Sequence, residues 1–148
     1  MTEMRRVVLL VALLAAFSSL LFTGPAAAQA GVVARISLSS QRMEVYVDGE
    51  PRYNWPVSTA RRGYRTPTGT FQPTALAVWH RSTIYSGSPM PYSIFFLRGY
   101  AIHGSYEIKH LGRPASHGCV RLHPSNAKAL FSLVSQRGRG NTRIQITP

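Results

Sequence analysis

Two alternating segments joined by Asp48-Gly49 constrain the fold of this 148-residue chain more than any other feature. In residues 42–47, and again in 52–57, apolar or aromatic side chains occupy every second position, the period of a strand with one buried face. The Asp-Gly pair favours a tight type I′ turn between them. The sequence therefore predicts an antiparallel hairpin. Because Pro56 has no N–H to donate, its strand is predicted to lie at a sheet edge or to end there.

The remaining apolar pattern predicts a mainly β, compact single domain with one clear helix near the C-terminus. Further strands are predicted at residues 32–37, 94–97, 100–103 and 142–147, and another is indicated over 71–78. The helix is predicted to begin at Pro124 or Ser125 and to stop at Gly138. Its buried face follows the i, i+3, i+4, i+7 pattern of Ala127, Leu130, Phe131 and Val134.

The first 28 residues predict an export signal. Arg5-Arg6 precedes an apolar stretch over residues 7–22, and Ala26-Ala27-Ala28 forms a small-residue cleavage site. Cleavage is predicted after Ala28, with Ala30 as the alternative. The apolar stretch is shorter than the roughly 20 residues that span a bilayer, so no stable membrane anchor is expected after signal removal. The protein is therefore predicted to be exported and periplasmic.

The charge balance is strongly basic and indicates an anionic partner. The chain has 17 Lys+Arg against 5 Asp+Glu, a formal net charge of +12. Loss of residues 1–28, which hold Glu3, Arg5 and Arg6, would lower this charge by one. A positive field attracts any polyanion. Because export removes the protein from genomic nucleic acid, no nucleic-acid partner is predicted, and the anionic cell envelope is favoured.

Cys119 is the only cysteine, so it has no intramolecular disulfide partner. The surrounding Ser116-His117-Gly118 brings an imidazole and a glycine next to the thiol, and His103 ends the apolar run upstream. A cysteine and a histidine brought close by folding are the minimal apparatus of thiol acyl transfer. Such a pairing can leave the thiol mostly ionised at neutral pH. Cys119 is therefore predicted to be a nucleophile and His103 its base.

His117 is the alternative base, since it lies only two residues from Cys119. Side chains at this spacing on an extended chain point the same way without converging. His117 is therefore predicted to shape the pocket and the oxyanion site, together with the backbone N–H groups of Gly118 and Cys119. Arg121 is predicted to bind a carboxylate through its forked guanidinium, with a solvated surface arginine as the alternative. Glu107 is predicted to point to solvent.

The segments around His103 and Cys119 resemble the active-site signature of the L,D-transpeptidase (YkuD-type) catalytic domain family. The resemblance rests on Ile102-His103-Gly104 and on residues 111–122, which contain the Ser-His-Gly-Cys core. It extends to residues 66–71 and 124–127, and so covers nearly all of the chain beyond the export signal. It implies a catalytic domain over residues 32–148.

The resemblance also implies the reaction and several site residues. Its substrate would be a peptidoglycan tetrapeptide stem, cut after the third residue with loss of D-alanine and joined to an amine acceptor. That acceptor is a neighbouring stem, giving a 3→3 cross-link, or an envelope lipoprotein; attack by water would make the protein an L,D-carboxypeptidase. The carbonyl of Gly104 would orient His103, and residues 82–91 would form a lid. Tyr92 would line the pocket, with Ser116 and Gly118 also binding substrate.

Three further interpretations remain open. Tyr85 and Met90 either line the pocket or simply pack. His103, His117, Cys119 and His123 offer zinc donors, but the paired-cysteine or His-x3-His spacing of structural zinc sites is missing, so no metal or cofactor is predicted. A non-catalytic wall-binding module would explain the basic charge but leave the cysteine and its histidine unexplained. His80 and His110, like His123, receive no chemical role.

Overall fold

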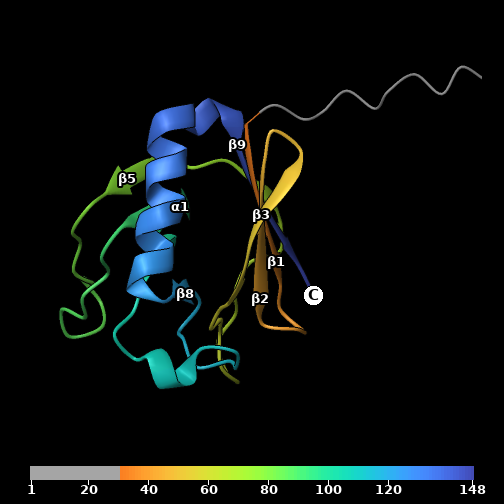
Figure 1. Cartoon of the computed structure of the whole chain (residues 1–148). Helices are drawn as coiled ribbons and strands as arrows, with labels where there is room; N and C mark the ends of the chain where they lie inside the picture. Colours follow the sequence, from red (N-terminus) through yellow and green to blue (C-terminus); the bar gives the residue numbers. More distant parts are fainter. Residues whose placement is uncertain (1–30) are drawn as a thin grey trace, which may run out of the picture.

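A computed structural model describes residues 31–148 (Figure 1). The predicted export signal at 1–28 lies outside the described residues. The elements, in chain order, are β1 (Val32–Ser37), β2 (Arg42–Val47), β3 (Glu50–Pro56), β4 (Gly69–Phe71), β5 (Ala75–Ala77), β6 (Ser93–Leu97), β7 (Tyr100–Gly104), β8 (Val120–Leu122), α1 (Pro124–Arg137) and β9 (Thr142–Thr147). Two short 3-10 turns, Ile108–His110 and Arg139–Asn141, complete the described chain. The predicted mainly β fold with one α-helix near the C-terminus is confirmed for these residues.

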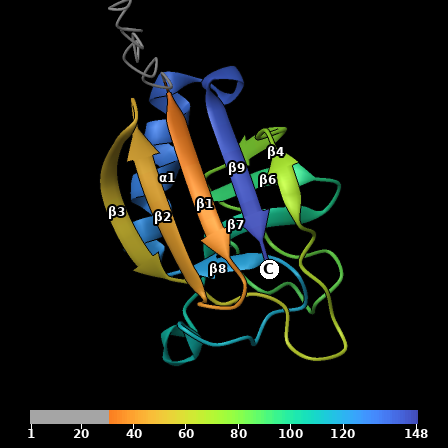
Figure 2. The ribbon, with the colours of Figure 1, turned by 90° about the vertical axis from the view of Figure 1, so that its right-hand side faces the viewer.

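Five strands form the first sheet, in the order β3-β2-β1-β9-β4 (Figure 2). The predicted hairpin is confirmed, since β2 and β3 pair antiparallel around Asp48 and Gly49. Both turn residues have positive φ, 52° and 86°, as a type I′ turn requires. β3 is an edge strand that ends at Pro56, as its missing N–H predicts. The parallel pair of β1 and β9 joins the two ends of the described chain.

The second sheet has four strands in the order β5-β6-β7-β8. The single strand indicated over residues 71–78 is wrong, because this segment divides between the two sheets. β4 ends at Phe71 and pairs with β9, whereas β5 begins at Ala75 and pairs with β6. Pro73 lies between them and offers no N–H to continue a ladder, so the chain crosses from one sheet to the other at this point.

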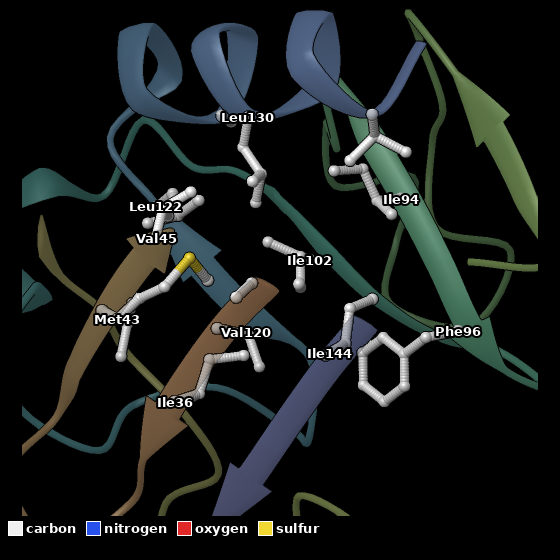
Figure 3. Close-up of a cluster of buried hydrophobic side chains, with 14 of the residues drawn as sticks. Ile36, Met43, Val45, Ile94, Phe96, Ile102, Val120, Leu122, Leu130 and Ile144 are labelled. Atoms are coloured by element: carbon white, nitrogen blue, oxygen red, sulfur yellow. The ribbon is translucent and has the colours of Figure 1, made fainter. Parts of the chain in front are cut away.

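The core lies between the two sheets and α1 (Figure 3). Ile36 and Ile144 enter it from the first sheet, and Ile102 enters from the second. The predicted helix is confirmed from Pro124 to the cap at Gly138. Its Ala127, Leu130 and Val134 are buried, while Phe131 is only partly so. No helix within residues 31–148 is both long and apolar enough to cross a membrane.

Candidate active site

The pairing of β7 with β8 places the histidine of one strand beside the cysteine segment of the other. The two strands are parallel, with Ile102 opposite Val120 and His103 opposite Arg121. Ile102 and Val120 are fully buried in the core. Because side chains alternate along a strand, His103 and Arg121 lie on the opposite face of the sheet, and Cys119 precedes Arg121 by one strand period. The fold therefore brings these three side chains to one face.

This face is the floor of a cavity of about 560 Å³, within the size range of small-molecule sites. Cys119, His103 and Arg121 all line it, and residues 82–90 contribute several of its walls. The complete lining is Arg61, His80, Ser82, Thr83, Ile84, Tyr85, Ser88, Met90, Phe95, Gly99, Tyr100, His103, Glu107, His110, Ala115, Ser116, His117, Cys119 and Arg121.

The loop before Cys119 is fixed by internal hydrogen bonds. The fully buried Ser116 hydroxyl donates to the Cys119 carbonyl oxygen at 2.6 Å and accepts the Gly118 N–H at 3.0 Å. The Thr66 hydroxyl donates to the Gly118 carbonyl at 2.8 Å. The Gly118 N–H is thus engaged within the loop in this structure, which differs from its predicted part in the oxyanion site. The Ser116 hydroxyl, predicted to bind substrate, here holds the loop that carries the nucleophile candidate.

Gly118 is required at its position by both conformation and space. Its φ is +135°, a value that residues with a Cβ rarely adopt. A Cβ at this position would lie 2.6 Å from Cε1 of Tyr100 and 2.9 Å from the backbone carbonyl oxygen of Arg65. The glycine therefore lets the loop pass between Tyr100 and residue 65 and turn into β8.

His103 is held as a single neutral tautomer. Its Nδ1 lies 2.7 Å from the carbonyl oxygen of Gly104, which can only accept a hydrogen bond, so Nδ1 carries the proton. Nε2 then keeps its lone pair and is free to accept a proton. Burial is the main cause that lowers the pKa of His103 from 6.5 to about 4. The charges of Arg121 and His80 also lower this pKa, whereas the hydrogen bond to Gly104 opposes the shift. The Gly104 carbonyl, which was expected to orient His103, lies within hydrogen-bond distance of the His103 ring.

The thiol of Cys119 is neutral in this resting arrangement. Burial raises its pKa, while a hydrogen bond from the backbone of Ala101 and the charge of Arg121 oppose that rise. The sulfur also lies 3.9 Å from the Gly99 carbonyl oxygen. The raised pKa does not favour the mostly ionised thiol that a Cys–His pairing can produce, because a neutral His103 supplies no positive charge to stabilise a thiolate.

The low pKa of His103 predicts a loss of stability in mild acid. In the unfolded chain the imidazole binds a proton near pH 6.5, whereas in the fold it does so only near 4. The contribution of neutral His103 to the free energy of unfolding is therefore fully present above pH 6.5. This contribution, roughly 3 kcal/mol, is lost as the pH falls through 4. The pKa of Asp48 is also lowered, by a hydrogen bond from Gly31, but from 3.8, so its loss falls at lower pH.

The measurement is the free energy of unfolding in urea from pH 7.5 to pH 4. We expect His103→Asn to lose much less stability over this range than the wild type. The matched control is His123→Asn, which removes another imidazole but retains an acceptor for the α1 N-terminus, where His123 Nδ1 now accepts the Ser125 N–H. Equal acid sensitivity of the wild type and His103→Asn would show that His103 titrates normally in the fold.

His117 is held between two tyrosine rings from separate loops. Tyr85 stacks on it with the ring centroids 4.1 Å apart and an angle of 13°, and Tyr64 meets it edge-on at 4.6 Å. Partial burial and the charges of Arg61 and Arg121 lower the pKa of His117. His117 is therefore a neutral ring held at the cavity wall. It is better suited to donate a hydrogen bond from a fixed position than to act as a mobile acid.

Arg121 forms an ion pair that the sequence did not indicate. Its Nη1 lies 2.8 Å from Oε2 of Glu107, and His110 Nδ1 lies 3.7 Å from the same oxygen. The prediction that Glu107 points to solvent is thus incomplete, because its largely exposed side chain also lines the cavity and binds Arg121. Arg121 is mostly buried, so the alternative of a solvated surface arginine is wrong.

Tyr92 lies elsewhere than its predicted place. It is absent from the cavity lining and packs against Phe131 of α1, with the ring centroids 5.9 Å apart. Its φ is +55°, at the point where the chain passes from the 82–91 loop into β6. Tyr85 and Met90, the other two residues considered for the lining, do line the cavity.

Several lining residues carried no sequence signal of their own. His80 meets Phe95 edge-on across the cavity floor, and Tyr100 fills the space beside Gly118. They come from segments that are brought together only by the sheet, so spacing along the chain could not group them. Within residues 31–148, no three His, Cys, Asp or Glu side chains gather closely enough to hold a metal ion.

Known proteins of one family are similar to this chain in sequence and in fold. Residues 31–146 match the model of the L,D-transpeptidase catalytic domain, YkuD. The YkuD protein of Bacillus licheniformis is 26% identical over 117 residues, which are 76% of this chain and 64% of that protein. A solved L,D-transpeptidase from Stackebrandtia nassauensis is 27% identical with a TM-score of 0.70, over 82% of this chain and 57% of that one.

A third relative is similar at the level of fold. L,D-transpeptidase 3 from Mycobacterium tuberculosis, solved in complex with a faropenem-derived adduct, has a TM-score of 0.67 at 20% identity. The similarity covers 80% of this chain and 60% of that structure. This chain therefore spans less than two thirds of the length of each of the three relatives.

Proposed function

This chain belongs to the L,D-transpeptidase (YkuD) family, and we propose that it is a peptidoglycan L,D-transpeptidase that works by cysteine acyl transfer. The observation that carries the proposal is the common cavity of Cys119, His103 and Arg121 on one face of the β7–β8 pair. A thiol, a base with a free nitrogen and a fixed cation are the groups that acyl transfer from an anionic peptide needs.

In the proposed acylation, Nε2 of His103 accepts the proton of the Cys119 thiol as the sulfur attacks a peptide carbonyl carbon. The carbonyl is that of the third residue of a tetrapeptide stem. The tetrahedral intermediate collapses when the bond to the fourth residue breaks, and His103 returns the proton to the leaving amine of D-alanine. A thioester on Cys119 remains. Because both groups are neutral at rest, the proton moves during the attack rather than before it.

In the proposed second step, an amine attacks the thioester carbon. His103 accepts the amine proton, the carbon–sulfur bond breaks, and the sulfur regains a proton. An amine on a neighbouring stem gives a 3→3 cross-link, and one on an envelope lipoprotein attaches that protein to the wall. Water in the place of the amine would give an L,D-carboxypeptidase product.

The oxyanion of each intermediate needs hydrogen-bond donors. The Gly118 N–H is bound to Ser116, so we assign the role to the Cys119 N–H together with the clamped ring of His117. Tyr85 belongs to the 82–91 loop, so this loop acts as a lid that holds His117 in place when closed. A neutral donor that is already fixed in place stabilises developing negative charge without needing to reorient.

Arg121 is proposed to bind a carboxylate of the stem, in exchange for the carboxylate of Glu107. Replacing Arg121 by Lys keeps the charge but removes the forked pair of N–H donors. We expect Arg121→Lys to raise KM by roughly tenfold, the cost of about one charge-assisted hydrogen bond, with thiol alkylation largely unchanged. Steady-state kinetics with a tetrapeptide donor measure this change.

Glu107→Gln is the matched variant, because it frees Arg121 without altering the guanidinium. KM should fall or stay the same in this variant, since the substrate carboxylate no longer competes with Glu107 for Arg121. If Arg121→Lys left KM unchanged, Arg121 would serve only to hold Glu107.

We further propose that residues 1–28 direct export, so that the catalytic domain over 32–148 acts in the periplasm. The function is tested by incubating the purified protein with a disaccharide tetrapeptide and analysing the products by mass spectrometry. Dimer formation with loss of D-alanine supports the transpeptidase. Tripeptide alone would assign the carboxypeptidase reaction, and the absence of both products would contradict the proposal.

A further inference from the structure

The outer face of the five-stranded sheet is opposite the core and is covered by no helix or strand of residues 31–148 (Figures 1 and 2). Strand alternation decides which side chains it carries. Ile36, Met43 and Ile144 point into the core, so their neighbours Arg35, Arg42 and Arg143 point outward. Each of the three central strands therefore contributes an arginine to this face.

All three arginines donate hydrogen bonds to uncharged partners, Arg143 from its Nη1 to the carbonyl oxygens of Gly140 and Thr142 at 3.1 and 3.2 Å. Arg35 Nε donates to Oε1 of Gln145 at 3.1 Å, and its guanidinium lies 4.6 Å from the ring centroid of Tyr46. Arg42 Nε donates to Oδ1 of Asn54 at 2.6 Å, and its Nη2 donates to the Asn54 carbonyl at 3.0 Å. Neither Arg35 nor Arg42 forms an ion pair in the described chain, although Glu44 lies opposite Arg35 in the β1–β2 register.

A fourth arginine adjoins them at the edge of the sheet. Arg52 lies at the irregularity where the β2–β3 register shifts, and with Tyr46 and Asn54 it lines a shallow hollow of about 280 Å³. The hollow also contains Glu44, whose Oε2 accepts the Tyr46 hydroxyl at 2.9 Å. An ordered aromatic and a cation beside a concave surface can accept an extended chain.

The face is far from charge balance. Glu44 is its one acidic group, since Glu50 pairs with Val47 and alternates to the other side of the sheet. Within residues 31–148 the arginine ion pairs are those of Arg121 with Glu107 and of Arg137 with Asp48, and neither is on this face. Four arginines thus share this face with one carboxylate.

We propose that this face binds a linear polyanion with repeating phosphate or carboxylate groups, while the cavity on the other sheet stays open. A polymer is favoured over a bilayer, because the exposed large apolar side chains of residues 31–148 lie on other segments: Tyr64, Val78, Trp79, Ile84, Tyr85, Tyr106 and Ile108. Binding to a membrane surface usually combines cations with apolar side chains that insert. Guanidinium groups suit phosphate and carboxylate oxygens through paired N–H donors.

The test measures the anisotropy of fluorescein-labelled linear polyphosphate with the Cys119→Ser protein, so that binding is separated from catalysis. The variant Arg35→Gln/Arg42→Gln/Arg52→Gln/Arg143→Gln should weaken binding by at least roughly tenfold, as expected for the loss of several salt-sensitive phosphate contacts. The matched control changes four exposed arginines from other segments to Gln, Arg62, Arg65, Arg98 and Arg113, and so alters the net charge equally. Its affinity should change by less than about threefold.

A salt titration uses the protein with its arginines intact. Its result therefore does not depend on whether the quadruple variant folds. The slope of log Kd against log salt should be about 2–3, as four phosphate contacts predict for a single-stranded polyanion. Equal weakening by the two quadruple variants, or a slope near zero, would overturn the proposal. Tighter binding to phosphatidylglycerol vesicles than to polyphosphate would show that the face serves a membrane surface instead.

Discussion

Replacing His103 by Ala is expected to remove acylation of Cys119 by a peptide donor while leaving its alkylation by iodoacetamide nearly unchanged. His103 is neutral at physiological pH, because burial lowers its pKa to about 4. It therefore lends no charge to a thiolate, and a reagent that needs only the thiolate does not depend on it. A peptide donor does, because its leaving amine must receive a proton. General acid–base catalysis of this kind contributes roughly 10²–10⁴ in rate.

The measurement compares the two rates in the wild type, His103→Ala, His117→Ala and the control His110→Ala, which also changes a cavity histidine. His117→Ala should slow acylation by roughly 10² through loss of an oxyanion donor. Alkylation of the wild type should accelerate as the pH rises above neutral, because burial raises the pKa of the thiol. Parallel loss of alkylation and acylation in His103→Ala would show that the pair is ionised at rest. Loss of acylation in His117→Ala alone would exchange the roles of the two histidines.

Gly118→Ala is expected to destabilise the fold and to displace the nucleophile. A new Cβ would lie 2.6 Å from Tyr100 and 2.9 Å from the Arg65 carbonyl oxygen, in a backbone conformation with φ of +135°. Strain and overpacking together cost on the order of 3 kcal/mol. Moving Tyr100 alone does not relieve the contact, because residue 65 presents backbone.

Thermal unfolding and the alkylation rate of Cys119 measure this effect. Gly112→Ala is the matched control, because Gly112 also has a positive φ, +90°, but has nothing within 4 Å of its would-be Cβ. It separates the conformational cost from the steric one. A similar loss of stability in both variants would show that the close approach to Tyr100 and Arg65 is unimportant.

The elements with a local pattern could be predicted from the sequence. The β2–β3 hairpin follows from alternation and an Asp-Gly turn, and α1 follows from a periodic apolar face between Pro124 and Gly138. Both depend on contacts between residues close in the chain. Cys119 and His103 could be singled out because a lone cysteine and a strand-ending histidine carry chemistry by residue type.

The rest depends on contacts that the chain pattern does not encode. Glu107 and Arg121 form their pair because the turn after β7 folds over β8. The Gly118 N–H is taken by Ser116 through a loop geometry that alternation says nothing about. The direction of the pKa shift of Cys119 could not be predicted for the same reason, since burial by distant segments raises the pKa of the thiol.

Intact-protein and peptide mass spectrometry after brief mixing with a disaccharide tetrapeptide tests whether Cys119 is the nucleophile. We expect an adduct on the peptide that contains Cys119, with the mass of the donor less D-alanine, and the same adduct in the presence of EDTA. Cys119→Ser should carry no adduct and form no product. An adduct on another residue, turnover by Cys119→Ser, or activity lost to EDTA and restored by zinc would contradict the assignment of Cys119 as the nucleophile.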